Sequence, residues 1–232
     1  MNSIKVAISQ SNYIPWKGYF DNIARVDEFV LYDDMQYTKR DWRNRNKIKT
    51  NNGLKWLTIP VKVKGKYFQK IKDTEIIDQS WNDQHFQRLK QNYSNAKCYD
   101  EVIDRIEDLY SLATQPTISK VNHHFLVHIC KFLNIDTNLS FSSDYNLKED
   151  DKTKRLVDIC LQLNATKYYS GEAAKSYMDE SLFTNKQISV NYFNYSDYKE
   201  YDQLYGKFEH GVSILDLIFS EGKNAINFLK HT

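Results

Sequence analysis

A dense polar cluster follows a short apolar run near residue 30. Phe29 to Leu31 lead directly into Tyr32, Asp33 and Asp34, and amides, aromatic rings and cations follow almost without an apolar break. The members of this cluster are Gln36, Tyr37, Lys39, Arg40, Trp42, Arg43, Asn44, Arg45, Asn46, Lys47 and Lys49. Neither an amphipathic helix nor an alternating surface strand needs this mixture. The cluster therefore indicates a binding site carried by a scaffold.

Two guanidinium groups in the cluster have a spacing suited to anion binding. Arg43 and Arg45 flank Asn44, and alternate side chains of an extended segment share one face. Such a pair can hold two phosphates or a carboxylate through paired hydrogen bonds, with Tyr37 and Trp42 shaping the pocket. We expect an anion or a nucleotide-sugar here. A solvated run of charges and an RNA-reading surface are the alternatives, although RNA binding favours a broader basic surface.

Four residues are candidates for proton transfer. Asp33 and Asp34 follow a predicted buried strand, where one carboxylate could act as a general base or bind Mg²⁺; a turn or helix-capping pair is the alternative. His85 follows Trp81 by one helical turn, which suits a hydrogen-bonded core histidine or, if it faces a cleft, a general base. His210, just before Gly211, could reach the same cleft.

Further candidate ligand contacts lie in two loops. Gln10, Tyr13 and Trp16 follow the first predicted strand, where an amide, a phenol and an indole could contact a ligand or simply cap and pack the loop. Gln36 belongs to the central cluster. Ser170 and Gly171 end a later strand and open a helix, so their backbone amides could hold an anion. The GxSxG elbow of nucleophilic serines is absent.

Metal binding and disulfides are not expected. His124 and His128 share a helical face at metal-ligand spacing, but no third ligand is near in sequence and HEXXH is absent. The three cysteines, Cys98, Cys130 and Cys160, are odd in number and lack a CxxC pair. The sequence assigns no metal site and leaves any cofactor unknown.

Apolar periodicity and turn residues predict alternating strands and helices. Extended segments are expected at 5–9, 28–32, 55–63, 139–142, 167–170 and 188–193. Helices are expected at 19–26, 80–93, 99–112, 117–133, 151–163, 172–178, 213–219 and 224–229. Ser80 is the expected N-cap of the second of these helices. Ser213 with Asp216 has the pattern of a capping box.

This element order predicts an α/β fold with a mostly parallel, Rossmann-like sheet. The first strand, loop, helix and second strand are best built as a right-handed crossover between parallel strands. Ligands of such sheets bind at the carboxyl ends of the strands, where residues 10–19 and 33–46 both fall. We expect a single domain over 1–232 with a helical insertion at 80–134, because no linker or repeat divides the chain.

Composition restricts the partners and the compartment. Lys and Arg number 32 against 30 Asp and Glu, a net charge of +2, so attraction to anions must come from local clustering. The apolar run at 4–8 is too short for a signal peptide, and nowhere do about 18 apolar residues follow one another. We therefore expect a cytoplasmic protein with no membrane insertion.

Several motifs together resemble the WbqC-like protein family. They are Gln10 with Tyr13 and Pro15, the run Gly18-Tyr19-Phe20, YDDMQYTKRDWRNRNKI at 32–48, WLTIPV at 56–61, Trp81 with His85, Tyr168 to Gly171, and Ser213 to Leu217. The resemblance covers essentially the whole chain. It implies a bacterial protein encoded with genes for O-antigen, the polysaccharide of lipopolysaccharide, or for other surface polysaccharides.

The role implied by this resemblance is tailoring of a nucleotide-activated sugar. We expect a transferase for a nucleotide-sugar or other phosphorylated sugar, amino sugars included, with an unidentified acyl or aminoacyl donor; tRNA is a less favoured partner. The first crossover is also similar in layout to nucleotidyltransferase-like folds, but Trp16 and Tyr19 stand where histidines would carry the positive charge. An ATP- or CTP-dependent ligase and a non-catalytic sugar-binding module are the alternatives.

Overall fold

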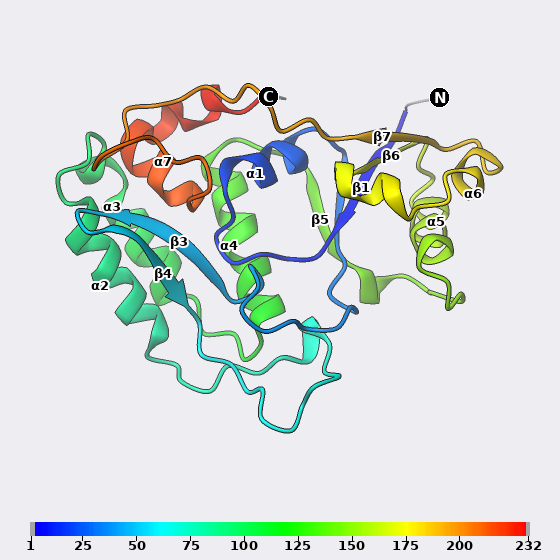
Figure 1. Cartoon of the computed structure of the whole chain (residues 1–232), viewed down its shortest axis with the longest axis horizontal. Helices are drawn as coiled ribbons and strands as arrows, with labels where there is room; N and C mark the ends of the chain where they lie inside the picture. Colours follow the sequence, from blue (N-terminus) through cyan, green and yellow to red (C-terminus); the bar gives the residue numbers. More distant parts are fainter. Residues whose placement is uncertain (1–2, 231–232) are drawn as a thin grey trace.

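A parallel five-stranded sheet forms the centre of the molecule (Figure 1). The structure, a computed structural model, describes residues 3–230. The strands are β1 (Lys5–Ser9), β2 (Glu28–Leu31), β5 (Asn138–Phe141), β6 (Lys167–Ser170) and β7 (Ser189–Tyr192), in the spatial order β5-β2-β1-β6-β7. The predicted α/β, Rossmann-like fold is confirmed.

The strand order places a switch point between β1 and β6. From β1 the chain builds outward through β2 to β5, then returns to place β6 on the other side of β1 and continues to β7. Val6 pairs with Glu28 of β2 and with Tyr168 of β6. The loops after β1 and β6 therefore diverge at the carboxyl edge of the sheet, which is where ligands of open α/β sheets bind.

Helices cover both faces of the sheet because β1 and β2 are apolar on both sides. Ala7 and Phe29 face one layer, formed with α1 (Lys17–Ala24) and α4 (Ile118–Phe132), whereas Val6 and Val30 face a second layer with α5 (Lys152–Gln162). Buried parallel strands show this continuous apolar pattern. A short α6 (Ser181–Thr184) joins the second layer.

The three helices predicted within 80–134 are present. They are α2 (Trp81–Tyr93), α3 (Tyr99–Ser111) and α4. Ser80 stands at the N-cap position of α2, as predicted, but its hydroxyl donates to Asp78 at 2.7 Å and makes no capping hydrogen bond. The helices predicted at 172–178 and 224–229 correspond to 3₁₀ helices, at Glu172–Ser176 and Gly222–Phe228.

A separate antiparallel hairpin stands beside the sheet. It pairs β3 (Arg45–Thr50) with β4 (Gly53–Thr58) around a turn at residues 51–52. No strand was predicted from sequence at the position of β3. Its inward-facing side begins with a buried amide, Asn46, so the alternation of apolar and polar residues that marks a strand is not visible there. The amide is satisfied by donating to the carbonyls of Tyr13 and Ile14 at 3.1 and 2.9 Å.

A long strap without helix or strand, residues 193–213, connects β7 to α7 (Ile214–Glu221) and is held by buried carboxylates. Asp216 accepts hydrogen bonds from Tyr93, Tyr201 and Gln203 at 2.8, 2.7 and 2.6 Å. Ser213 accepts from the N–H of Leu215 as a cap should, but the Asp216 side chain points to this network, so the predicted capping box is wrong.

None of the helices within residues 3–230 combines the length and apolar character needed to cross a membrane.

Removing the Asp216 carboxylate should destabilise the fold. Asp216→Ala leaves the buried donors of Tyr93, Tyr201 and Gln203 without their acceptor, and we expect the free energy of unfolding to fall by about 3 kcal/mol. Urea unfolding at pH 7 measures it. Asp216→Asn keeps a side-chain oxygen and should lose markedly less; equal losses for the two variants would contradict the role given to the hydrogen bonds.

Candidate substrate site

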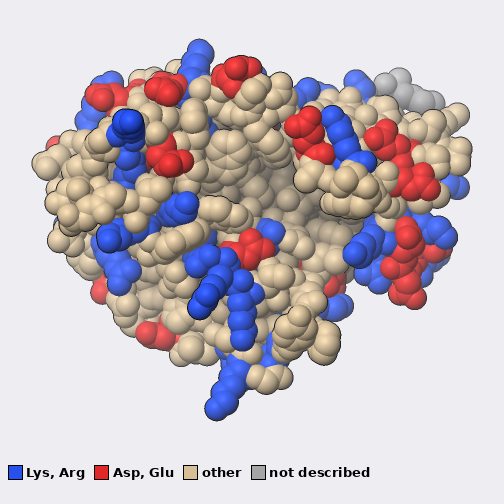
Figure 2. Space-filling view, in the orientation of Figure 1, with Lys and Arg blue, Asp and Glu red and all other residues tan. Residues whose placement is uncertain are grey.

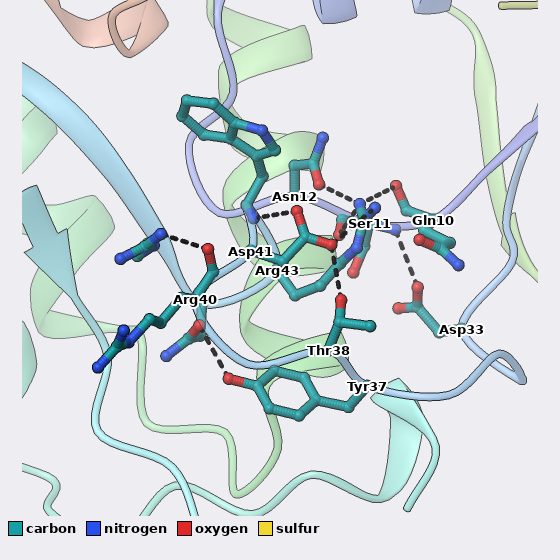
Figure 3. A network of polar contacts seen from close by, with 12 residues as sticks. Gln10, Ser11, Asn12, Asp33, Tyr37, Thr38, Arg40, Asp41 and Arg43 are labelled. Carbon is teal, nitrogen blue, oxygen red and sulfur yellow. Dashed lines mark hydrogen bonds and ion pairs between the residues drawn. The ribbon is translucent and has the colours of Figure 1, made fainter. Parts of the chain in front are cut away.

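Two loops meet at the carboxyl edge of the sheet. The β1–α1 loop binds the segment before β3 through the N–H of Tyr13, which donates to the carbonyl of Trp42 at 3.0 Å. The guanidinium of Arg43 donates to the carbonyls of Gln10 and Ser11, at 3.4 and 3.2 Å, and to the side-chain oxygen of Asn12 (Figure 3). Arg43 is therefore the link between both loops.

The helix α4 holds these loops from below. Asn122 donates to the Ser11 hydroxyl and to the Arg43 carbonyl, both at 2.9 Å. One turn earlier, Ser119 donates to the carboxylate of Asp33, which also accepts from the N–H of Ser11 at 2.9 Å. Ser119 and Asn122 thus fix the ends of β1 and β2 to one helix.

The predicted carboxylate pair is divided between two structural roles. Asp33 is buried, and desolvation raises the pKa of its carboxyl, opposed in part by the hydrogen bonds from Ser119 and Ser11. Burial also acts to raise the pKa of Asp34, but hydrogen bonds and charge from Lys72, Ser142 and Lys70 outweigh it and lower that pKa. Asp34 contacts Lys72 at 2.6 Å. Both carboxylates are fully engaged within the protein.

One cavity, of about 370 Å³, lies at the switch point of the sheet. We call it the switch-point cavity. Its walls come from the ends of β1 and β6, from the loop after β2, and from α5 and the 3₁₀ helix after β6. The lining residues are Ile8, Ser9, Gln10, Tyr32, Met35, Arg43, Lys152, Leu156, Tyr168, Ser170, Gly171, Ala173, Ala174 and Tyr177. Gln10, Arg43, Ser170 and Gly171 were predicted from sequence as site residues.

A second cavity, of about 310 Å³, lies on the other side of the Arg43 link. We call it the tryptophan cavity. It is lined by Asn12, Pro15, Trp16, Trp42, Asn46, His210 and Gly211. Trp16, Trp42, Asn46 and His210 were predicted site residues. The structure therefore separates the predicted residues into two neighbouring cavities.

Arg43 and Asn12 connect the two cavities. Arg43 lines the switch-point cavity, and its guanidinium holds the carbonyl oxygen of Asn12, which lines the tryptophan cavity. Figure 3 shows the amide nitrogen of Asn12 pointing away from Arg43. In Figure 2 a hollow occupies the middle of the face, with Lys and Arg side chains along its lower edge. The Arg43–Asn12 contact therefore forms part of the boundary between the two cavities.

The loop that carries Trp16 is tightly constrained. Ile14 has a φ of 35°, which a β-branched residue adopts only at a cost of about 1–3 kcal/mol. The indole of Trp16 packs directly over Gly18, since a Cβ there would lie 2.3 Å from the ring. The Pro15-Trp16-Lys17-Gly18 sequence thus places the indole at the start of α1.

The imidazole of His210 reaches the tryptophan cavity from the strap. Burial lowers its pKa, and the charge of Lys17 lowers it further, whereas Glu200 and Glu209 oppose this. Lys17 is buried among the rings of Tyr198, Tyr201 and Phe208, 5.1–5.5 Å from their centres. His210 is therefore neutral near pH 7 and can accept a proton.

His85 and Tyr13 lie in the core. The Tyr13 hydroxyl is 2.9 Å from Nδ1 of His85 and 2.8 Å from the hydroxyl of Tyr110. Desolvation lowers the pKa of His85 to about 4, helped by the charge of Arg88 and opposed by a backbone hydrogen bond at Thr58. His85 and Tyr13 line neither of the two cavities, so the structure favours the core-histidine alternative over a general base.

Arg43 and Arg45 do not act on a common face. Arg45 lies with its guanidinium carbon 4.0 Å from the ring centre of Trp56, on the hairpin, while Arg43 points to the β1–α1 loop. The expected two-guanidinium grip is wrong, because β3 begins at Arg45 and the preceding residues turn toward the sheet.

Three other predicted residues are occupied in holding the cluster together. The hydroxyl of Tyr37 donates to the side-chain oxygen of Asn44 at 3.0 Å, and Asn44 donates to the carbonyl of Ile59 at 2.8 Å. Gln36 donates to the carbonyl of Tyr67 at 2.9 Å. They support the site and do not line either cavity.

Residues outside the prediction also contribute. Asn12 sits between two predicted residues, and its neighbours in the loop were its only sequence signal. Lys152 and Tyr177 line the switch-point cavity from α5 and from the residue after the 3₁₀ helix. Their distance in sequence from the central cluster concealed them. Ser119 and Asn122 could be found only as polar residues on the inward face of an otherwise apolar helix.

The comparison with known proteins assigns the family. A model of the WbqC-like protein family matches residues 10–228. The chain belongs to this family. This WbqC-like chain is also 51% identical, over 227 residues and 98% of each chain, to a protein of Mycobacterium tuberculosis named "Uncharacterized protein Rv1507c". No solved structure matches it significantly.

The buried state of His85 predicts an acid-dependent loss of stability. Its pKa of about 4 lies below the ordinary 6.5, so the unfolded chain binds a proton more readily, and this contribution is complete above pH 6.5 and lost as the pH falls toward 4. We expect His85→Gln to remove a pH dependence of up to about 3 kcal/mol between these values. Urea unfolding at several pH values tests it, and parallel curves for both proteins would contradict it.

Proposed function

We propose that this protein is a transferase that modifies a nucleotide-activated sugar in O-antigen or other surface-polysaccharide biosynthesis. The nucleotide part occupies the switch-point cavity, and the sugar extends past Arg43 into the tryptophan cavity. The single observation that carries the proposal is the pair of cavities joined by the Arg43–Asn12 contact. Family membership supports the biosynthetic setting by association.

The switch-point cavity suits a nucleotide in position and in charge. It lies at the carboxyl ends of β1, β2 and β6, the usual ligand position in open α/β sheets. Arg43 and Lys152 supply positive charge to its wall, and no Asp or Glu is among its lining residues within 3–230. Tyr32 and Tyr177 offer ring surface for a base. Phosphates would thus meet cations and not carboxylates.

The tryptophan cavity suits a sugar ring. Trp16 and Trp42 present flat apolar surface, while Asn12 and His210 provide the few polar contacts that orient a ligand in such pockets. The amide nitrogen of Asn12 is directed away from Arg43. The two sites are adjacent, so one elongated ligand can occupy both.

The neutral His210 supplies a base for acyl or aminoacyl transfer. An amine or hydroxyl of the bound sugar attacks the carbonyl carbon of an activated acyl group, and the imidazole takes the proton that the attacking atom loses. The bond from the carbonyl to the carrier breaks, and the carrier leaves with the electron pair and is protonated. The products are the acylated sugar and the free carrier.

A single added charge tests the switch-point cavity. Ala173 is an exposed lining residue, so Ala173→Glu places a carboxylate beside the phosphates, and Ala173→Gln is the matched neutral control. We expect a nucleotide-sugar panel to raise the melting temperature of the native protein and the Gln variant, with saturation worth about 2–3 kcal/mol, and to raise that of the Glu variant far less. Equal shifts for Glu and Gln would contradict this site, and a shift with ATP or CTP alone would favour a ligase.

Moving the Trp16 indole tests the sugar part separately. In Gly18→Ala the added Cβ collides with the ring, so the indole must leave its place in the tryptophan cavity. We expect a nucleotide-sugar to bind this variant about tenfold more weakly, since stacking contributes roughly 1 kcal/mol or more, while the free nucleotide binds as before. Calorimetric titration with both ligands decides, and equal losses for both would contradict the assignment of the sugar to this cavity.

A further inference from the structure

A group of rings and cations lies on the outer face of the hairpin. Trp42 and Trp56 have ring centres 5.3 Å apart at 45°, and they are 40% and 37% exposed. The guanidinium carbon of Arg45 lies 4.0 Å from the Trp56 ring centre, and Nζ of Lys47 lies 5.3 Å from it. We call Trp42, Arg45, Lys47 and Trp56 the indole–cation patch.

The strand geometry explains why these groups share a face. Lys47 pairs directly with Trp56 across the hairpin, and Arg45 is two residues from Lys47 on the same strand. Alternate side chains of a strand point to the same side, so Asn46 and Ile48 between and beyond them face inward and are buried. Three of the four patch residues therefore stand on the paired strands of the hairpin, and Trp42 lies in the turn just before β3.

Within residues 3–230 the cations of the patch form no ion pair, although Arg45 is near enough to Asp41 for its charge to act on that carboxylate. Among the described residues, Arg43 pairs with Asp41 at 3.7 Å, but neither Arg45 nor Lys47 has an ion-pair partner. Arg45 donates instead to the backbone carbonyl of Arg40. Figure 2 shows several Lys and Arg side chains, with an acidic group among them, below the hollow of a molecule whose net charge is only +2.

The patch is continuous with the tryptophan cavity. Trp42 lines the cavity and also packs on Trp56. A ligand stacked on the patch can thus extend a reactive group past Trp42 toward His210. Arg45, Lys47 and Trp56 line neither cavity, so these three members of the patch stay free when a nucleotide-sugar is bound with its sugar against Trp42.

We propose that the indole–cation patch binds the carrier of the acyl donor, through a phosphorylated nucleoside in that carrier. The base stacks on the exposed indoles and the phosphates contact Arg45 and Lys47. Proteins that bind nucleic acid without reading its bases stack the bases on aromatic rings and hold the backbone with nearby cations. Guanidinium groups bind phosphate through paired hydrogen bonds. The inference rests on the proposed function, since it places the second substrate of that reaction.

The shared chemistry can come from coenzyme A or from the end of a tRNA. Calorimetric titration of the full chain with adenosine 3′,5′-bisphosphate tests the shared part, and titrations with coenzyme A and with uncharged tRNA distinguish the sources. We expect the Arg45→Ala/Lys47→Ala variant to bind the bisphosphate at least about tenfold more weakly. The control Lys55→Ala/Lys64→Ala removes the same charge from two exposed lysines, the first on the other face of this hairpin, and should change the affinity less than about twofold.

The outcomes separate this inference from the proposed function. The inference is overturned if the patch variant binds the bisphosphate as tightly as the native protein does. It is also overturned if the control variant loses as much affinity as the patch variant. If Ala173→Glu abolishes bisphosphate binding and the patch variant does not, the bisphosphate occupies the switch-point cavity, and the inference is overturned while the proposed function stands. If the patch variant loses the bisphosphate but no nucleotide-sugar binds the native protein, the patch is supported as a site and the proposed function fails.

Discussion

The guanidinium of Arg43 is the contact on which the candidate site depends. It donates to two backbone carbonyls and one side-chain oxygen of the β1–α1 loop, and so joins a loop of the parallel sheet to the segment that enters the hairpin. All three acceptors lie around one nitrogen, Nη1, while Nη2 lies 3.7 Å from the carboxylate of Asp41. A planar guanidinium can thus contact two groups at fixed positions, whereas a lysine ammonium offers a single compact charge. Without this link the two cavities would lose their common wall.

Buried polar groups beneath this link define where the loops lie. Asp33 accepts from Ser119 of α4 and from the backbone of Ser11, and Asn122 of the same helix donates to both loops. Leaving such groups unpaired costs about 1–3 kcal/mol each, so alternative loop positions are unfavourable. The many polar residues of this region therefore have two roles: some contact a ligand and others hold the loops in place. The residue types alone do not show which residue has which role.

Apolar periodicity predicted the parallel sheet and most helices because burial of those faces dominates their energetics. β6 was predicted at its observed bounds, 167–170, and the sheet class followed from the strand and helix order. β3 was not recognised, since Asn46 is buried by hydrogen bonds and not by apolar packing. His85 and Arg45 show the limit for the site: their environments depend on partners far away in sequence, Tyr13 and Trp56 among them, and no local pattern specifies those contacts.

The strap of residues 193–213 shows how a segment without regular structure can still position a reactive group. Two hydrogen bonds fix it to α1. The ammonium of Lys17 donates to the carbonyl of Lys199 in the strap, and the hydroxyl of Tyr198 in the strap donates to the carboxylate of Asp21. Burial lowers the pKa of Lys17 to about 8, opposed by the charge of Glu200, so the ammonium remains charged at pH 7. That charge disfavours a second one on His210. The lysine that fixes the strap to α1 thus adds to burial, the larger cause, in lowering the pKa of the imidazole.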